Sequence, residues 1–229
     1  MFDLYIANKN YSSWSLRPWV LMKALEVPFN EHLVPFEGGF GASHEAFKRF
    51  SPSGLVPCLV DGDIAVWDSL AIVEYVAEQH PNVWPNDKAA RAWARSATAE
   101  MHSGFGALRD ECSMNCAVRV ELNSLSAKLK ADLARLDTLW QQGLEGFGGP
   151  FLAGEHFSAV DAFYAPVAFR VQTFKLPVSE AAQAYVERLI ALDAMQAWYQ
   201  SALEEPWREP MHEAETLKNG VLKIDYRKS

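Results

Sequence analysis

Three serines lie close together in the segment NYSSWSLRP at residues 10–18, where a short apolar run gives way to a helical pattern. A serine hydroxyl at such a junction can accept a hydrogen bond from a free backbone N–H group and so cap the helix. It can also donate a hydrogen bond to a thiolate bound in front of the helix N-terminus. The spacing of Ser12, Ser13 and Ser15 leaves both roles open, although Ser15 best fits the position of the cap.

The dipeptide Val56-Pro57 lies directly before an apolar strand pattern that begins at Cys58. A cis peptide bond before Pro57, which a tight turn can require, would leave the backbone groups of Val56 available. Those groups could then pair with an extended peptide in the way that an added strand does. A plain turn ahead of an edge strand is the alternative interpretation.

The pair Asp68-Ser69 opens a helical pattern, and the common role of such a pair is to cap the helix. The same position offers backbone N–H donors and the positive end of the helix dipole, which together favour a bound anion. A carboxylate held there by the Ser69 hydroxyl would bring a neighbouring amine next to Asp68.

The elements that must position these residues alternate between strand and helix in the first third of the chain. The patterns predict strands at 2–7, 29–34, 58–60 and 64–66, and helices at 12–26, 44–49 and 68–79. The turn Asp61-Gly62-Asp63 predicts that the last two strands form a hairpin. This order is that of an α/β thioredoxin-like domain.

The remainder of the chain follows a helical pattern after two prolines in residues 80–85. We expect helices at 87–116, 122–145, 158–172, 179–190 and 192–204. We expect no strand after residue 86 and an irregular extension at 205–229. The sequence therefore predicts two domains, a thioredoxin-like domain at 1–80 and an all-α helical bundle at 87–229, joined by a linker at 81–86.

The composition excludes several classes of protein. Of 229 residues, 49% are apolar and 22% are charged, and the net charge of -8 argues against nucleic-acid binding. No apolar stretch approaches the ~20 residues of a membrane span, and no secretory signal pattern opens the chain. Three cysteines are too few for a disulfide framework, so we expect a cytoplasmic location. Cys112 and Cys116 suggest buried small residues and no metal site.

Together these segments resemble the glutathione transferase superfamily, and the resemblance runs from Phe2 to about Glu205. It rests on residues 12–17, 51–57, 68–72 and the stretch GEHFSAVD at 154–161. The last stretch is similar to the superfamily's N-capping box, in which Ser158 and Asp161 exchange hydrogen bonds with each other's backbone.

Among the classes of the superfamily, the serine-type zeta pattern is the most similar. Trp14 occupies the place of the cysteine in that pattern, which argues against zeta-type isomerisation of maleylacetoacetate-like substrates. Asp68 stands where Glu or Gln is more usual. No cysteine lies at the junction, which argues against thiol exchange of the omega type. Tyr5 and Tyr11 rank below the serines as thiol activators.

The resemblance implies that glutathione is a co-substrate and that no other cofactor is needed. Ser13, or less favourably Ser12, would donate to the glutathione sulfur and lower its thiol pKa by about one to two units. The residues that would bind glutathione are Val56, Pro57, Asp68 and Ser69. A small hydrophobic electrophile would bind between the domains, and the protein would be a homodimer without nucleic-acid or membrane partners.

Three alternatives stay open at this point. The protein could isomerise a substrate or reduce a peroxide with glutathione, and these reactions differ from conjugation only in their products. It could also bind glutathione or hydrophobic ligands without catalysis, an interpretation that Trp14 favours.

The roles of three arginines also stay open. Arg17, Arg109 and Arg170 could hold the carboxylate of an acidic co-substrate, or simply form ion pairs.

Overall fold

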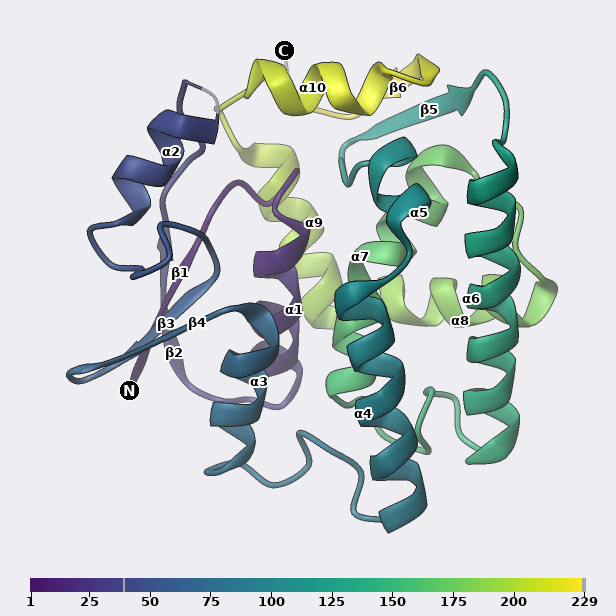
Figure 1. Ribbon diagram of the computed structural model, residues 1–229, viewed down its shortest axis with the longest axis horizontal. Coiled ribbons are helices and arrows are strands. Elements are labelled where there is room, and N and C mark those ends of the chain that lie inside the picture. Colours follow the sequence, from purple (N-terminus) through teal and green to yellow (C-terminus); the bar gives the residue numbers. More distant parts are fainter. Residues whose placement is uncertain (39, 228–229) are drawn as a thin grey trace.

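The computed structural model describes residues 1–38 and 40–227 (Figure 1). Its first part forms one four-stranded sheet in the order β2-β1-β3-β4, with β1 parallel to β2 and the other neighbours antiparallel. The elements are β1 (Phe2–Ile6), α1 (Ser13–Ala24), β2 (Phe29–Leu33), α2 (Phe40–Phe47), β3 (Cys58–Asp61), β4 (Ile64–Trp67) and α3 (Ser69–Ala77). The thioredoxin-like prediction is confirmed.

Each strand and helix predicted for this part is present, and most ends agree closely. The largest difference is at α2, which begins at Phe40 instead of His44. The predicted hairpin turns at Gly62, whose φ of 59° lies in the left-handed region that glycine adopts without a steric penalty.

The second part of the chain is helical, as predicted. Its helices are α4 (Lys88–Ser103), α5 (Gly106–Glu111), α6 (Ala127–Gly146), α7 (Ala159–Phe174), α8 (Glu180–Ala191), α9 (Asp193–Glu204) and α10 (Pro210–Leu217). Every residue of α7 except Gln172 is buried, because α1, α4 and α8 pack around it. The predicted capping box starts this helix: the Ser158 N–H donates to the Asp161 carboxylate at 3.0 Å.

The prediction of no strand after residue 86 is wrong. β5 (Val118–Leu122) pairs with β6 (Gly220–Asp225) as an antiparallel two-stranded sheet. In β5, Val118 and Val120 are buried while Arg119 and Glu121 are not, which is the period-two alternation of a strand. Residues 205–229 were expected to be irregular, but within the described residues they form α10 and β6, which return the chain to β5 (Figure 1).

The single helix predicted for residues 87–116 is also wrong. The chain leaves the helical conformation at Gly104 and at Phe105, whose φ is 56°, and α5 ends at Glu111. Cys112 and Cys116 are therefore not on a common helix, although both are buried, as expected for small core residues. The helix predicted for 122–145 begins only at Ala127, where the Ser126 hydroxyl accepts from the Leu129 N–H.

The two parts share one continuous apolar core. Helix α1 packs against both α7 and α9, and the ring of Trp19 meets that of Trp198 edge-on at 5.1 Å. The backbone joins the two parts as well, because the Ala159 N–H donates to the Val83 carbonyl at 2.8 Å. The two sides of the interdomain region are therefore fixed relative to each other by packing.

None of the helices within residues 1–38 and 40–227 combines the length and the apolar composition that a membrane crossing requires.

Candidate active site

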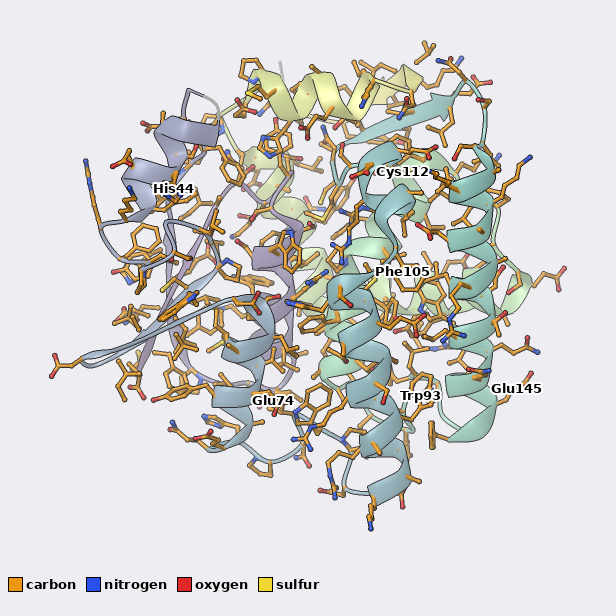
Figure 2. The ribbon with its side chains drawn as sticks, viewed as in Figure 1. His44, Glu74, Trp93, Phe105, Cys112 and Glu145 are labelled. Atoms are coloured by element: carbon orange, nitrogen blue, oxygen red, sulfur yellow. The ribbon has the colours of Figure 1, made fainter. Side chains whose placement is uncertain are left out.

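A cavity of about 740 Å³ lies where α1, α3 and the loop before β3 face α5, α7 and the C-terminal segment. All six residues predicted to form the site line it: Ser12, Ser13, Val56, Pro57, Asp68 and Ser69. In Figure 2, His44 marks α2 on the sheet side, and Phe105 and Cys112 mark the two ends of α5 on the helical side. The structure thus brings the predicted residues together in one pocket.

The three serines at the start of α1 have different environments. Helix α1 begins at Ser13, so the expectation that Ser15 caps it is wrong. The Ser15 hydroxyl is fully buried and accepts from the Ala7 N–H at 3.4 Å and from the Ser12 hydroxyl at 2.7 Å. Ser12 uses its only hydroxyl proton in that bond. The Ser13 hydroxyl has no hydrogen-bond partner among the described residues, so of the three serines it is the one left to donate into the cavity.

Asp68 and Ser69 begin α3 as predicted. Asp68 is the N-cap and accepts from the Leu70 N–H at 2.8 Å. Its backbone has φ 74° and ψ 135°, outside the regions that non-glycine residues prefer, which costs about 1–3 kcal/mol. The Ser69 hydroxyl accepts from Nη1 of Arg17 at 3.3 Å.

His102 of α4 faces Asp68 from the helical side, with 3.4 Å between its Nε2 and the Asp68 carboxylate. Burial lowers the pKa of His102; Asp68 opposes this shift, and Arg17 and Arg109 reinforce it. The imidazole is therefore neutral near pH 7, and the exposed edge of the Asp68 carboxylate is left to bind a cation such as an ammonium group.

The Val56-Pro57 peptide bond is cis, as the sequence suggested. Both residues precede β3, so Val56 lies in the loop that borders the cavity and not in the strand ladder. Gly54 in this loop has φ 64°, and a Cβ atom at Gly54 would come within 2.5 Å of the His44 ring. The tight approach of this loop to α2 fixes the edge of the pocket.

The two tyrosines near the junction are both engaged elsewhere. The Tyr11 hydroxyl donates to Glu213 at 2.5 Å, and burial together with this hydrogen bond raises the pKa of Tyr11. Tyr5 lies in β1 with its ring stacked on those of His32 and Phe50, at centroid distances of 4.6 and 4.2 Å. The Tyr11 hydroxyl proton is used in the bond to Glu213, and Tyr5 does not line the cavity.

The junction loop before α1 is held by the end of α9. Glu205 is buried and accepts from the Lys9 N–H at 2.5 Å, and from the N–H and side-chain amide of Asn10 at 3.3 and 3.1 Å. The indole of Trp198 donates to the Lys9 carbonyl at 2.9 Å. The helical part thus fixes the loop that leads into Ser12 and Ser13.

Trp14 takes part in a stack of charged and aromatic groups beside the serines. Its ring has the guanidinium of Arg17 at 4.1 Å and that of Arg109 at 5.0 Å from its centroid, and His102 meets it edge-on at 5.2 Å. Trp14 also lines the cavity. The residue that departs from the zeta pattern is therefore part of the wall between the two domains.

The sequence missed the contribution of the C-terminal segment. Glu209, Met211, His212 and Glu215, on or next to α10, all line the cavity. The His212 ring stacks on those of Tyr11 and Phe36 at 5.0 and 4.7 Å. No local pattern predicts this roof, because the contacts join residues that lie about 200 positions apart in the chain.

The comparisons with known proteins agree with this architecture. The family models for the N-terminal and C-terminal domains of glutathione S-transferase match residues 11–79 and 87–201. Glutathione S-transferase GstB of Escherichia coli is 27% identical over 218 residues, covering 86% of this chain and 92% of that protein. Maleylacetoacetate isomerase of Rattus norvegicus is 29% identical over 219 residues, covering 93% and 95%.

Solved structures give the same result for the fold. Human glutathione S-transferase T1-1 superposes with a TM-score of 0.65 at 25% identity, covering 95% of this chain and 97% of that one. A Burkholderia glutathione transferase homolog with bound glutathione superposes with a TM-score of 0.66 at 21% identity, covering 88% and 97%. From the two family models, which together span both parts of the chain, we conclude that this protein belongs to the glutathione S-transferase family.

Proposed function

We propose that the protein binds glutathione along the N-terminal wall of the cavity and that the Ser13 hydroxyl activates its thiol. The observation that carries this proposal is the Ser13 hydroxyl itself, which lies at the first residue of α1, inside the cavity, without a protein partner among the described residues. A donor in that position can form a hydrogen bond with a sulfur anion and is also next to the positive end of the α1 dipole.

The other groups of this wall match the remaining parts of the tripeptide. The backbone of Val56 would pair with the cysteinyl residue of glutathione, as an added strand does. The hydroxyl of Ser69 and the N-terminus of α3 would hold the γ-glutamyl carboxylate, and Asp68 would hold the γ-glutamyl ammonium group. The strained backbone of Asp68 supports a binding role, because such conformations persist where function requires them.

The energy required of Ser13 is modest. A free thiol has a pKa of about 8.5, and one hydrogen bond to a charged group contributes about 1.5–3 kcal/mol. Since one pKa unit corresponds to about 1.4 kcal/mol, Ser13 can lower the thiol pKa by about one to two units. The bound thiol would then be largely ionised near pH 7 without a general base.

The electrophile would enter between the two walls, where apolar side chains are abundant. Trp14, Phe47 and Met114 line this space, and Met211 contributes from the C-terminal segment. The lining favours a small co-substrate with an apolar body, to which the thiolate adds directly.

The test is a titration of bound glutathione by the ultraviolet absorbance of the thiolate. We expect a lowered thiol pKa in the wild type, a return toward about 8.5 in Ser13→Ala, and a smaller change in the matched control Ser12→Ala. Binding of glutathione with an ordinary thiol pKa in the wild type would contradict serine activation and support a non-catalytic binding protein.

A second candidate function is glutathione-dependent isomerisation, which the similarity to maleylacetoacetate isomerases from Rattus norvegicus and Vibrio cholerae favours. In an isomerisation the thiolate adds to a cis double bond and leaves again, so glutathione is not consumed. Incubation with maleylacetone distinguishes the two: a trans product with an unchanged glutathione concentration supports the isomerase, and loss of glutathione supports conjugation. Trp14, in place of the zeta cysteine, argues against the isomerisation.

The homodimer stays a prediction from the resemblance, and the cytoplasmic location stays a prediction from the cysteine content. Light scattering after size exclusion tests the first, with twice the mass of one chain as the expected result.

A further inference from the structure

Three arginines from three helices gather beside the cavity: Arg17 of α1, Arg109 of α5 and Arg170 of α7. Arg17 is fully buried, and Arg170 is 4% exposed. Within the described part of the chain, no carboxylate lies within ion-pair distance of any of the three. A buried charge is normally paired, because its removal from water is costly. This cluster therefore concentrates positive charge in a protein whose net charge is -8.

The guanidinium groups of Arg109 and Arg170 each donate hydrogen bonds to backbone carbonyl groups and also line the cavity. Nε of Arg170 donates to the Cys112 carbonyl at 2.8 Å, while its Nη1 is buried and has no hydrogen-bond partner among the residues described. Arg109 donates from Nε to the Gly104 carbonyl at 3.0 Å and from Nη2 to the Met101 and His102 carbonyls. Both arginines line the cavity.

Arg17 supports this arrangement from behind. Its guanidinium lies 4.1 Å from the centroid of the Trp14 ring and 4.7 Å from that of Phe163, and the two aromatic faces partly replace a counterion. Its Nη1 is bound to Ser69, and Arg17 does not line the cavity. Arg17 thus adds positive charge from behind, while Arg109 and Arg170 line the cavity.

The charges are held close enough to affect one another. Burial lowers the pKa of Arg170 to about 10, and the nearby Arg109 contributes to that shift. Burial also lowers the pKa of Arg17 and of Arg109. All three remain protonated near pH 7, so a bound anion would relieve their mutual repulsion.

We propose that Arg109 and Arg170 form an anion site for the electrophile, so that the co-substrate carries a carboxylate on an apolar body. This inference rests on the proposed function, since it places the electrophile opposite the glutathione sulfur. The two arginines are on the helical wall together with Ser113 and Met114, whereas the groups assigned to glutathione are on the thioredoxin-like wall. Two guanidinium donors facing one cavity match the planar oxygens of a carboxylate.

Acidic residues of the C-terminal segment would repel an anion bound beside them. Glu209 and Glu215 also line the cavity, and the Glu209 carboxylate lies 2.7 Å from Nδ1 of His212. A carboxylate would therefore be held by Arg109 and Arg170 and opposed by Glu209 and Glu215.

The test compares two S-substituted glutathiones by calorimetry, which requires no catalysis. S-(4-carboxybenzyl)glutathione differs from S-benzylglutathione only by the carboxylate at the far end of the ring. We expect the wild type to bind the carboxylated ligand at least tenfold more tightly, because charge-assisted hydrogen bonds to arginine are strong. Equal affinities for the two ligands would overturn the anion site while leaving the proposed function intact.

Variants locate the effect. Arg170→Met should bring the two affinities close together, and Arg109→Gln, at a less buried position, provides a second test if Arg170→Met does not fold. The matched control is Arg135→Met, because Arg135 is exposed on α6 and pairs with Glu100 at 2.6 Å; it should keep the full preference.

A preference that persists in both Arg109 and Arg170 variants would overturn the assignment. Failure of both ligands to bind the wild type would overturn the proposed function, and this inference with it.

Discussion

The two walls of the cavity are built in different ways. The thioredoxin-like wall consists of short segments at helix N-termini, where Ser13 begins α1 and Asp68 caps α3. The helical wall consists of single side chains from separate helices, such as Arg109 of α5 and Arg170 of α7. Arg109 is held by the carbonyl of nearby Gly104, and Arg170 by the carbonyl of Cys112, 58 positions away. The first wall offers hydroxyl, amide and carboxylate groups, and the second offers guanidinium groups and apolar side chains.

The two walls differ in what they contribute: the thioredoxin-like wall carries the resemblance to the family, and the helical wall carries the specificity of this protein. The N-terminal wall follows motifs that many glutathione transferases share, so it fits the common co-substrate. The helical wall and its roof depend on contacts between distant parts of the chain, such as the Tyr11–Glu213 hydrogen bond. We infer that glutathione binding depends on the first wall and the choice of electrophile on the second.

Glu205 joins the helical part to the junction loop before α1, and we expect its loss to have the largest effect on stability. Glu205→Ala would leave the buried N–H groups of Lys9 and Asn10 without their acceptor, so we expect the free energy of unfolding to fall by about 3 kcal/mol. Urea denaturation measures this change, and the exposed neighbour Glu204 provides the control, Glu204→Ala, which should change it by less than about 0.5 kcal/mol. Equal effects of the two substitutions would show that the loop does not depend on the helical part.

Low pH should destabilise the C-terminal segment at 210–225, which forms the roof of the cavity, before it destabilises the rest of the molecule. Arg227 pairs with Glu213 and Asp225 and joins α10 to the end of β6. Burial raises the pKa of Glu213, but its hydrogen bonds from Arg227 and Tyr11 outweigh burial and lower it overall. The pKa of Asp225 is lowered mainly by the hydrogen bond from Arg227.

Because both pKa values lie below the ordinary 4.5 and 3.8, these groups stabilise the folded state above those values. That contribution is lost as the pH falls below the ordinary values and through the lowered pKa values of the folded state. Neutral hydrogen bonds are roughly half as strong as charged ones. Hydrogen exchange should therefore show residues 210–225 losing protection below about pH 4.5 before α3 does. Simultaneous loss in both segments would contradict a separate roof, and Arg227→Met should remove the pH dependence.

The smallest expected effect distinguishes serine from tyrosine activation. Tyr11→Phe removes one hydrogen bond to Glu213, which Arg227 continues to hold, so we expect a loss of stability of about 1 kcal/mol. The pKa of the bound glutathione thiol should stay at its wild-type value, in contrast to Ser13→Ala. A thiol pKa raised by Tyr11→Phe would assign activation to the tyrosine and overturn the role of Ser13.

Local patterns predicted the N-terminal wall well because its determinants lie within a few residues of one another. The capping role of Asp68 and the box formed by Ser158 and Asp161 depend on bonds that span two or three positions. The alternation of β1, α1 and β2 follows from apolar spacing in the same way. One local prediction was wrong: Ser15 does not cap α1, because the helix begins two residues earlier.

Other errors arose where a distant partner decided the conformation. The alternation of Val118 and Val120 was a strand signal that the sequence interpretation missed within a stretch assigned to helices. That strand is completed by β6, about 100 residues later, which no window around residue 118 contains.

The sequence by itself determined the order of elements in the thioredoxin-like part and the caps at Asp68 and Ser158, because these depend on backbone preference over a few positions. The tertiary structure alone decided that Asn10 is bound to a residue 195 positions away and that residues of α10 line the cavity. It also decided that three arginines lie together without a carboxylate partner within residues 1–38 and 40–227. Such features follow from long-range packing, in which burial and charge depend on residues that the local sequence does not specify.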